Sequence, residues 1–383
     1  MKLGLGLYRQ MLKRDNYRFA RQAGCTHLVA HLVDYFADQV IPSADRQGDG
    51  TWGRTHGGDR LWELAELLSI KREMNEEGLE WEAIENFDPA HWHDILLDGP
   101  RRSEQIENIR TIILRVGEAG IPIIGFNFSI AGVWGLIRRD WARGRAVSVG
   151  FVSQEQGGPP EPPMPRGQVW NMIYDPEAVI RNEIMAPVTQ EQLWNRLERF
   201  LSDVLPTAEK AGVVLAAHPD DPPMPTIRGH ARLVYQPHLY RRLFDRVPHR
   251  HLKAEFCLGT LQEMNGGDGR DVYAITDEHS RRGEIGYVHF RNVRGKVPNY
   301  QETFVDDGDL DMIRILQILR RNHYDGVIIP DHTPDMACAA PWHAGMAFAL
   351  GYIKAAMRCV EQGVTAGAAD RGAGHDREVS LAC

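Results

Sequence analysis

The chain has 383 residues, of which 43% are hydrophobic and 25% are charged. These proportions are ordinary for a folded globular protein and exclude a largely disordered chain, a collagen and a coiled coil. The 44 Lys and Arg residues and the 52 Asp and Glu residues give a formal net charge of −8. A nucleic-acid-binding protein would carry a concentrated basic patch, which this sequence lacks, so we expect no nucleic-acid partner.

The cysteines predict a reducing environment. They are odd in number, scattered and without a Cys-x-x-Cys pair, which argues against a disulfide framework and favours a cytoplasmic protein. The first residues lack the apolar core of a signal peptide. No apolar run reaches the roughly 18 residues of a transmembrane helix, so we expect no membrane partner. The cysteines are Cys25, Cys257, Cys338, Cys359 and Cys383.

Short apolar runs alternate with amphipathic segments along the chain. We expect strands at 3–7, 26–31, 79–85, 121–127, 213–218, 252–257, 285–290 and 326–331. We expect helices near 16–23, 61–78, 103–119, 190–211, 237–246, 269–282, 309–322 and 343–362. Eight strands alternating with helices predict an α/β fold of the (β/α)8 TIM barrel type. The competing doubly wound sheet normally has a glycine-rich phosphate loop after its first strand, and this chain has none.

The predicted domain organisation is a single barrel over residues 1–362. Residues 144–175 include a Gly- and Pro-rich stretch and are expected to form an irregular excursion from it. A lid, an oligomer contact and a plain surface loop remain equally open for this segment. Residues 363–383 are small, polar and unpatterned, and we expect a disordered tail.

Four potential metal ligands end the last four predicted strands. They are His218, Cys257, His289 and Asp331. The carboxyl ends of barrel strands meet at one mouth, so these side chains should converge. Imidazole, thiolate and carboxylate together suit Mn, Fe, Co or Zn better than Mg or Ca, which prefer oxygen. The sequence therefore predicts a divalent transition-metal site with room for substrate.

Other polar residues are expected at the same mouth. Glu85 ends the third predicted strand, Asn127 ends the fourth, and Arg291 and Asn292 follow His289. Each is an equal candidate for substrate binding and for the scaffold of the barrel rim. His31 and Asn86 also end strands there.

His332 is the candidate for proton transfer. It adjoins Asp331, so its ring should lie near the metal without ligating it, which suits a general acid or base. The plainer alternative is a hydrogen bond to a neighbouring loop. His91 and His93 flank a tryptophan in a loop after the third strand. A loop that covers the site is one reading, and we expect instead that they are ordinary surface residues.

Five motifs resemble those of the mannonate dehydratase family, which belongs to the xylose-isomerase-like TIM barrels. The resemblance runs from the first strand to about residue 358 and is strongest from 211 to 333. The motifs are Ala217-His218-Pro219-Asp220-Asp221-Pro222-Pro223, Cys257-Leu258-Gly259-Thr260, His289-Phe290-Arg291-Asn292, Glu302-Thr303-Phe304-Val305-Asp306-Asp307-Gly308-Asp309 and Pro330-Asp331-His332.

The resemblance implies a Mn²⁺-dependent lyase, for which other divalent transition metals are also suitable. Such enzymes convert D-mannonate to 2-keto-3-deoxy-D-gluconate in hexuronate degradation, by α-proton abstraction and β-hydroxyl elimination. The implied ligands are His218, Cys257, His289 and Asp331, with His332 as the acid–base residue. The resemblance also implies a small-molecule sugar-acid substrate and a homo-oligomer.

Three positions depart from the family pattern. Ile329 stands where an arginine usually precedes the Pro-Asp-His motif, and Gly132-Val133-Trp134-Gly135 replaces an Asp-Trp pair. The usual tyrosine before the last helix is missing, and His343 is the candidate catalytic substitute. These departures leave open a metal-dependent isomerase, epimerase or lyase acting on another sugar or glycoside. A non-catalytic barrel is a third hypothesis, which four intact ligands disfavour.

Overall fold

The structure is a computed structural model. It describes residues 1–38, 41–42, 51–55, 60–266 and 271–363. Residues 364–383, nearly all of the expected disordered tail, lie outside the described residues. Among the residues that are described, no helix has the length and apolar character needed to cross a membrane.

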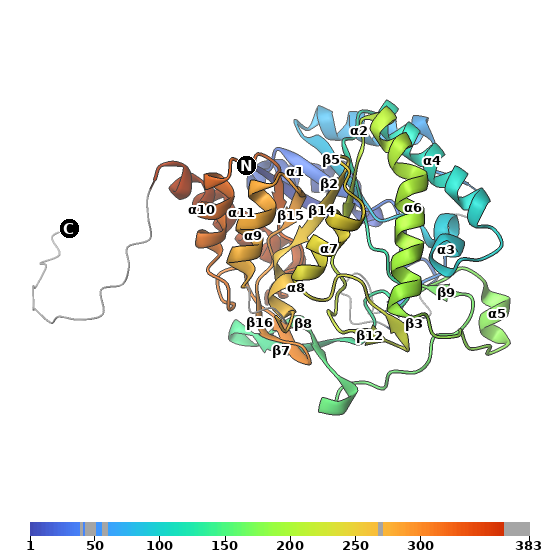
Figure 1. The fold of residues 1–383 in the computed structure, drawn as a ribbon. Helices are drawn as coiled ribbons and strands as arrows, with labels where there is room; N and C mark the ends of the chain where they lie inside the picture. The colour runs from blue at the N-terminus through green and yellow to red at the C-terminus, as the bar shows by residue number, and fades with distance from the viewer. Residues whose placement is uncertain (39–40, 43–50, 56–59, 267–270, 364–383) are drawn as a thin grey trace, which may run out of the picture.

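Eight parallel strands form a closed barrel, which confirms the TIM-barrel prediction (Figure 1). Each pairs with its neighbours in chain order, and the last pairs with the first. All eight coincide with predicted strands to within a few residues. They are β1 (Lys2–Leu7), β2 (His27–Ala30), β5 (Glu80–Glu85), β6 (Ile123–Phe126), β11 (Val214–Ala217), β14 (Leu252–Cys257), β15 (Ile285–His289) and β18 (Val327–Ile329).

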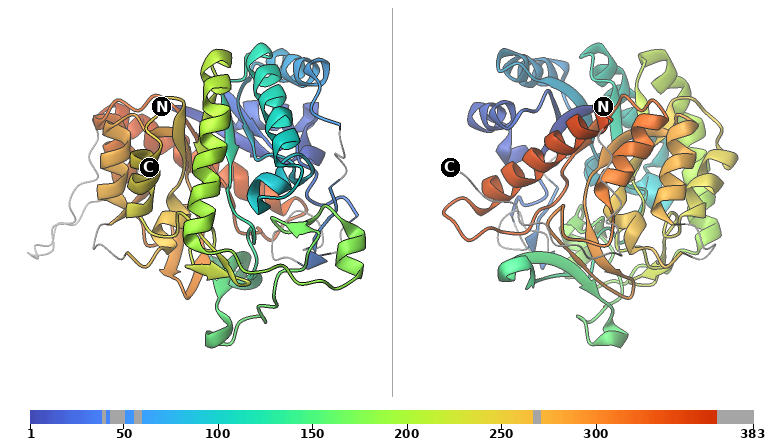
Figure 2. Two further views of the ribbon diagram at one scale, coloured as in Figure 1. Left: turned by 45° about the vertical axis from the view of Figure 1, so that its right-hand side comes forward. Right: turned by 90° about the vertical axis from the view of Figure 1, so that its left-hand side faces the viewer.

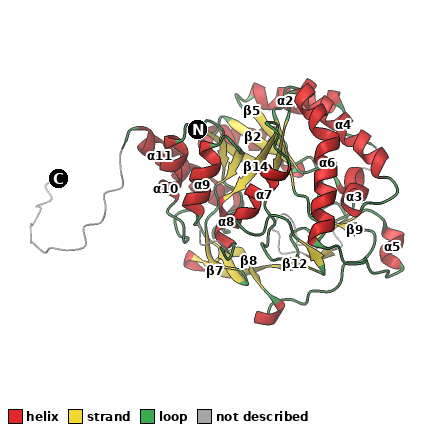
Figure 3. Cartoon of the chain, in the orientation of Figure 1, coloured by secondary structure: helices red, strands yellow, loops and turns green. Residues whose placement is uncertain are grey.

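Helices surround the barrel on the outside (Figures 2 and 3). Eight of them occupy the predicted intervals: α1 (Arg14–Ala23), α2 (Leu64–Glu76), α4 (Arg102–Glu118), α6 (Gln190–Ala211), α7 (His238–Arg246), α9 (Val272–Arg281), α10 (Met312–Arg321) and α11 (Pro341–Glu361). The ends of α6 show why sequence signals located them well. Thr189 and Gln192 form a capping box at its start, and Gly212 ends it with a left-handed φ of 69°.

Shorter elements complete the chain. Three further α-helices are α3 (Pro89–Leu97), α5 (Pro176–Ile180) and α8 (Leu258–Glu263). Single 3-10 turns are η1 (Arg9–Met11), η2 (Arg143–Arg145) and η3 (Gln154–Gln156). Three two-stranded ribbons pair β3 (Ile41–Pro42) with β4 (Thr51–Trp52), β9 (Gln168–Val169) with β10 (Met172–Ile173), and β12 (Thr226–Ile227) with β13 (His230–Ala231).

The expectation of surface positions for His91 and His93 was wrong. Asp88 caps α3 by accepting a hydrogen bond from the backbone N–H of Ala90, and Pro89 occupies the first helical turn. The resulting helix is buried, and its two histidines are only 1% and 7% exposed. The His93 ring stacks on Tyr174 with centroids 4.0 Å apart.

The barrel interior is filled by its own cluster of apolar side chains. Alternation along each strand places this cluster inside the barrel, while the next residues pack outward against the helices. Ile329 is a member and is buried, and glycines on β1 leave room for it. A Cβ atom at Gly4 would collide with Val327 and press on Ile329. The members are Val29, Ala83, Ile123, Ala216, Tyr287, Val327 and Ile329.

A four-stranded antiparallel sheet stands at the carboxyl end of the barrel (Figures 1 and 3). Its strand order is β16 (Val293–Lys296), β17 (Asn299–Glu302), β8 (Ala146–Val152) and β7 (Leu136–Ala142). The expectation of irregular structure from residue 144 was therefore wrong for β8. Its second partner, β17, lies some 150 residues further along the chain, so no local pattern signals the pairing.

Candidate active site

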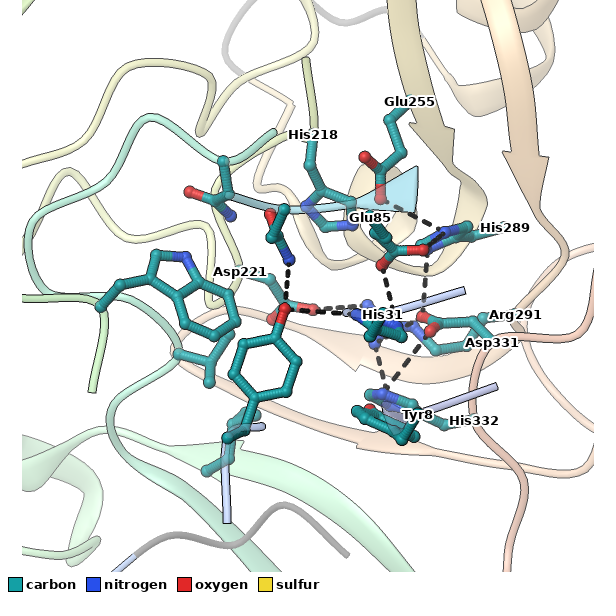
Figure 4. A pocket seen from close by; sticks show the side chains of 16 residues that line it. Tyr8, His31, Glu85, His218, Asp221, Glu255, His289, Arg291, Asp331 and His332 are labelled. Carbon is teal, nitrogen blue, oxygen red and sulfur yellow. Dashed lines mark hydrogen bonds and ion pairs between the residues drawn. The ribbon is translucent and has the colours of Figure 1, made fainter. Parts of the chain in front are cut away.

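The four predicted ligands lie together at the carboxyl end of the barrel. Cys257 and His289 are the last residues of β14 and β15, and His218 directly follows β11. One donor atom each from these three residues lies within 4.8 Å of the others. Asp331, just beyond β18, places Oδ2 3.5 Å from His289 Nδ1 and 4.0 Å from Cys257 Sγ. Figure 4 shows the two histidines and Asp331 facing a common centre.

The protonation tendencies of the two anionic ligands favour metal binding. Those of the two histidines oppose it: although burial lowers both values, Cys257 raises the pKa of His218 to about 9, and Asp331 holds the pKa of His289 well above its usual value. Burial by itself raises the pKa of the Cys257 thiol, but Arg291 and the two histidines, His218 and His289, bring it down to about 6. Burial also opposes ionisation of Asp331, but His332 and His289 hold its pKa well below the ordinary value. The set therefore offers a thiolate and a carboxylate at neutral pH, the forms that bind metals.

The unmatched polar atoms of the site also fit a divalent transition metal. His289 is 1% exposed, and within the described part of the chain its Nδ1, the nitrogen on the ligand side, makes no hydrogen bond. His218 Nδ1 lies 2.6 Å from the carbonyl oxygen of Pro219, which leaves Nε2 available as a ligand. Two imidazoles, a thiolate and a carboxylate are a donor set that suits Mn, Fe, Co or Zn.

Arg291 belongs to the scaffold of the site more than to substrate binding. It is 3% exposed and lines the pocket, but its guanidinium is surrounded by carboxylates. Its nitrogens approach Asp221 at 2.6 Å, Glu302 at 3.0 Å, Glu263 at 3.2 Å and Asp331 at 3.4 Å. A guanidinium with four acidic partners has little capacity left for a substrate carboxylate. Asp221 and Glu302 lie within the recognised motifs, yet no separate signal in the sequence assigns them to the site.

His332 holds a proton beside the metal ligands. Its Nδ1 lies 2.8 Å from Glu302 Oε1, and its Nε2 lies 3.5 Å from Asp331 Oδ1. Burial lowers its pKa, but Asp331 and Glu302 outweigh that effect and raise the pKa to about 10. The imidazolium is thus the prevailing form at neutral pH, and the ring lines the pocket where it can donate.

A wall of aromatic and apolar side chains faces the ligands across the pocket. The His31 ring stacks on Tyr8 with centroids 4.5 Å apart and 7° between the planes. Tyr35 places its hydroxyl 3.2 Å from His31 Nδ1 and accepts a hydrogen bond from Asn86 at 3.1 Å. The rest of this wall is Val133, Leu136 and Trp170.

The remaining residues predicted to bind substrate, Glu85, Asn127 and Asn292, differ in their surroundings. Glu85 and Asn127 line the pocket, and the buried Oδ1 of Asn127 has no hydrogen-bond partner among the described residues. Asn292 is a scaffold residue: its Nδ2 donates to the carbonyl oxygens of Val305 and Leu310.

The structure places His343 outside the pocket. Its Nε2 lies 3.0 Å from Asn16 Oδ1, and its ring packs edge-on against Phe19 and Trp342. The start of α11 therefore faces α1, and His343 is not among the catalytic residues that we propose. The residues that the sequence analysis missed are Tyr8, Tyr35, Val133, Leu136, Trp170, Asp221, Glu255 and Glu302.

Comparison with solved structures identifies the class of protein first. The L-ribulose 3-epimerase structure superposes with a TM-score of 0.56 at 13% identity, covering 97% of this chain and 99% of that one. At this identity the match shows the fold alone. The fold is thus that of the xylose isomerase-like barrels, and several solved structures that share it are named as sugar epimerases.

The family follows from closer matches. The model of the D-mannonate dehydratase (UxuA) family matches residues 53–148 and 178–364. Mannonate dehydratase from Streptococcus pneumoniae (strain 70585) is 32% identical over 287 residues, 71% of this chain and 75% of that protein. The protein from Streptococcus suis (strain 05ZYH33) gives the same values. The crystal structure of mannonate dehydratase from S. suis serotype 2 superposes with a TM-score of 0.71 at 26% identity, covering 95% of each chain.

The chain belongs to the mannonate dehydratase family. It is accordingly an enzyme of the lyase class.

Proposed function

We propose that the chain is a divalent-metal-dependent sugar-acid dehydratase that converts D-mannonate to 2-keto-3-deoxy-D-gluconate. The observation that carries this proposal is the convergence of His218, Cys257, His289 and Asp331 beside the pocket. Family membership supports D-mannonate as the first substrate to test.

The four ligands would hold the metal, and Mn²⁺ is the ion that we propose. When bound, such an ion supplies Lewis acidity that makes the proton next to a substrate carboxylate easier to remove. Apart from the metal, the pocket offers few groups that could bind the substrate carboxylate. Among the described pocket-lining residues Arg291 is the only Arg or Lys, and four acids already surround it.

Three further roles fall to side chains of the chain itself: proton donation, substrate binding and exclusion of water. His332 holds a proton at the edge of the metal site and would deliver it to the departing β-hydroxyl group. Asn127 offers a buried amide oxygen that can accept a hydrogen bond from a substrate hydroxyl. The aromatic wall around Tyr8 and Trp170 would exclude water from the reacting carbons.

The alternative function is isomerisation or epimerisation of a neutral sugar. The apolar side chains of Val133, Leu136 and Trp170 at the pocket wall favour it, as does the apolar Ile329 in the barrel interior. A neutral substrate would also need no free cation.

The test is an assay of Mn²⁺-reconstituted protein with D-mannonate, reading formation of the 2-keto-3-deoxy acid. We expect metal-dependent turnover that chelation abolishes and Mn²⁺ restores. Metal binding without any turnover of D-mannonate would contradict the substrate assignment. Neutral ketoses and aldoses, assayed in parallel for isomer formation, would then decide for the alternative.

A further inference from the structure

We propose that Glu85 and Glu255 are positioning residues that hold the His289 ring so that Nδ1, and not Nε2, binds the metal. The inference rests on the proposed metal site and adds to it two residues that do not themselves touch the metal.

The His289 ring lies between two groups of acidic side chains. On one side its Nδ1 is 3.5 Å from Asp331 Oδ2, within the ligand cluster. On the other side its Nε2 is 3.4 Å from Glu85 Oε2 and 3.3 Å from Glu255 Oε1. Figure 4 shows both glutamates reaching the same edge of the ring. An N–H on Nε2 would serve both carboxylates and leave Nδ1 with its lone pair directed at the metal.

The fold builds this arrangement into neighbouring strands. Glu255 lies two residues before Cys257 on β14, so both side chains point into the barrel. Gly125 on β6 provides the space, because a Cβ atom there would collide with the Glu255 carboxylate and with the Tyr287 hydroxyl. Glu85, the last residue of β5, supplies the second carboxylate beside His289 Nε2.

Besides His289, the groups close to the two carboxylates are the His31 ring and the Tyr287 hydroxyl. Glu85 is 7% exposed and Glu255 is 1% exposed. Within the described ranges, their ion pairs come only from histidine rings: His289 for both, and His31 at 3.6 Å for Glu85. Arg291, the nearby guanidinium, is engaged by other acids. Buried carboxylates are costly without a donor, so the pair and the His289 N–H stabilise each other.

His218 provides the contrast within the same site. Its Nδ1 lies against the carbonyl oxygen of Pro219, so it presents Nε2 to the metal. The two histidines should therefore bind through different nitrogens, one oriented by backbone and the other by the two glutamates. This difference is observable by spectroscopy.

The first experiment is NMR of the full chain, ¹⁵N-labelled at histidine and loaded with ¹¹³Cd²⁺. We expect scalar coupling from ¹¹³Cd to Nδ1 of His289 and to Nε2 of His218. Coupling to Nε2 of His289 would overturn the inference while leaving the metal site intact. Absence of bound cadmium would instead overturn the proposed metal site, so the two failures are distinguishable.

The second experiment measures Mn²⁺ affinity of the metal-free full chain by EPR. Glu255→Leu should weaken binding by about 10- to 100-fold, because His289 loses an acceptor that fixes its ring. Glu255→Gln should weaken it less, since the amide oxygen still accepts the N–H. Glu82→Gln, on the same β5 strand as Glu85, is the control and should match the wild type. Equal affinities in all three variants, with native circular dichroism, would contradict the proposal.

Discussion

The two sides of the pocket are built differently. The metal-facing side consists of residues at the ends of consecutive barrel strands β11, β14, β15 and β18, which backbone pairing holds in register. The opposite side consists largely of loop residues, among them Tyr8, Tyr35, Val133 and Trp170. Strand ends fix the chemistry, whereas loops can change the shape of the pocket without disturbing the ligands. Under the proposed function, reaction type and substrate choice therefore reside in separable parts of this molecule.

Removal of a ligand should have the largest effect on the metal-facing side. Cys257→Ser and Asp331→Asn should each reduce metal occupancy sharply and remove turnover, since each takes away a charged donor at neutral pH. Metal content by mass spectrometry and thermal unfolding of the metal-free protein check both parts. Undiminished metal in both variants would contradict the ligand assignment.

Loss of the proton donor should separate metal binding from chemistry. His332→Ala should retain the metal but lower kcat by about 10²- to 10⁴-fold, because general acid–base catalysis contributes that much. The matched control is His343→Ala, whose ring contacts Asn16 and Phe19 outside the pocket and should stay within about twofold of the wild-type kcat. A fully active His332→Ala variant would remove His332 from the mechanism.

A change on the opposite wall should have a moderate effect on turnover and none on the metal. Tyr35→Phe deletes the hydroxyl that links His31 to Asn86. Loss of hydrogen bonds worth about 1.4 kcal/mol would lower kcat/KM about tenfold. Steady-state kinetics and Mn²⁺ titration of the same sample test this separation. Weaker metal binding in Tyr35→Phe would show that the two sides are coupled.

The smallest effect is expected further out on that wall. Arg228 donates to the carbonyl oxygens of Pro162 and Pro163 and lies 4.1 Å over the Trp134 ring. Arg228→Leu should therefore lower the free energy of unfolding by about 1–3 kcal/mol, because these contacts and the hydrogen bond to the buried Gln168 Oε1 are lost. Urea unfolding measures this loss, and metal affinity should be unchanged. A variant as stable as the wild type would show that this contact does not stabilise the segment.

The same contrast explains how much could be predicted from the sequence. The barrel strands and their terminal donors follow local patterns, so the clustering of His218, Cys257, His289 and Asp331 could be predicted from position alone. Tyr35 and Trp170 lie in segments without periodicity, and only the folded chain brings them together. Glu255 was missed because a carboxylate inside a strand contradicts the usual apolar pattern. The β8–β17 pairing was missed because it joins distant segments.

His343 illustrates the opposite error. The sequence placed it near the site because it begins the last helix, where the resembled family has a tyrosine. In the structure this ring points toward α1, where it contacts Asn16 and Phe19. Sequence position at a helix start does not fix the direction of a side chain, since that depends on packing with a distant element.

Anomalous X-ray diffraction from Mn²⁺-soaked crystals tests the central claim most directly. The account predicts one strong peak with ligand distances of about 2.0–2.4 Å to donor atoms of His218, Cys257, His289 and Asp331. A peak bound elsewhere, or no peak at saturating Mn²⁺, would contradict it.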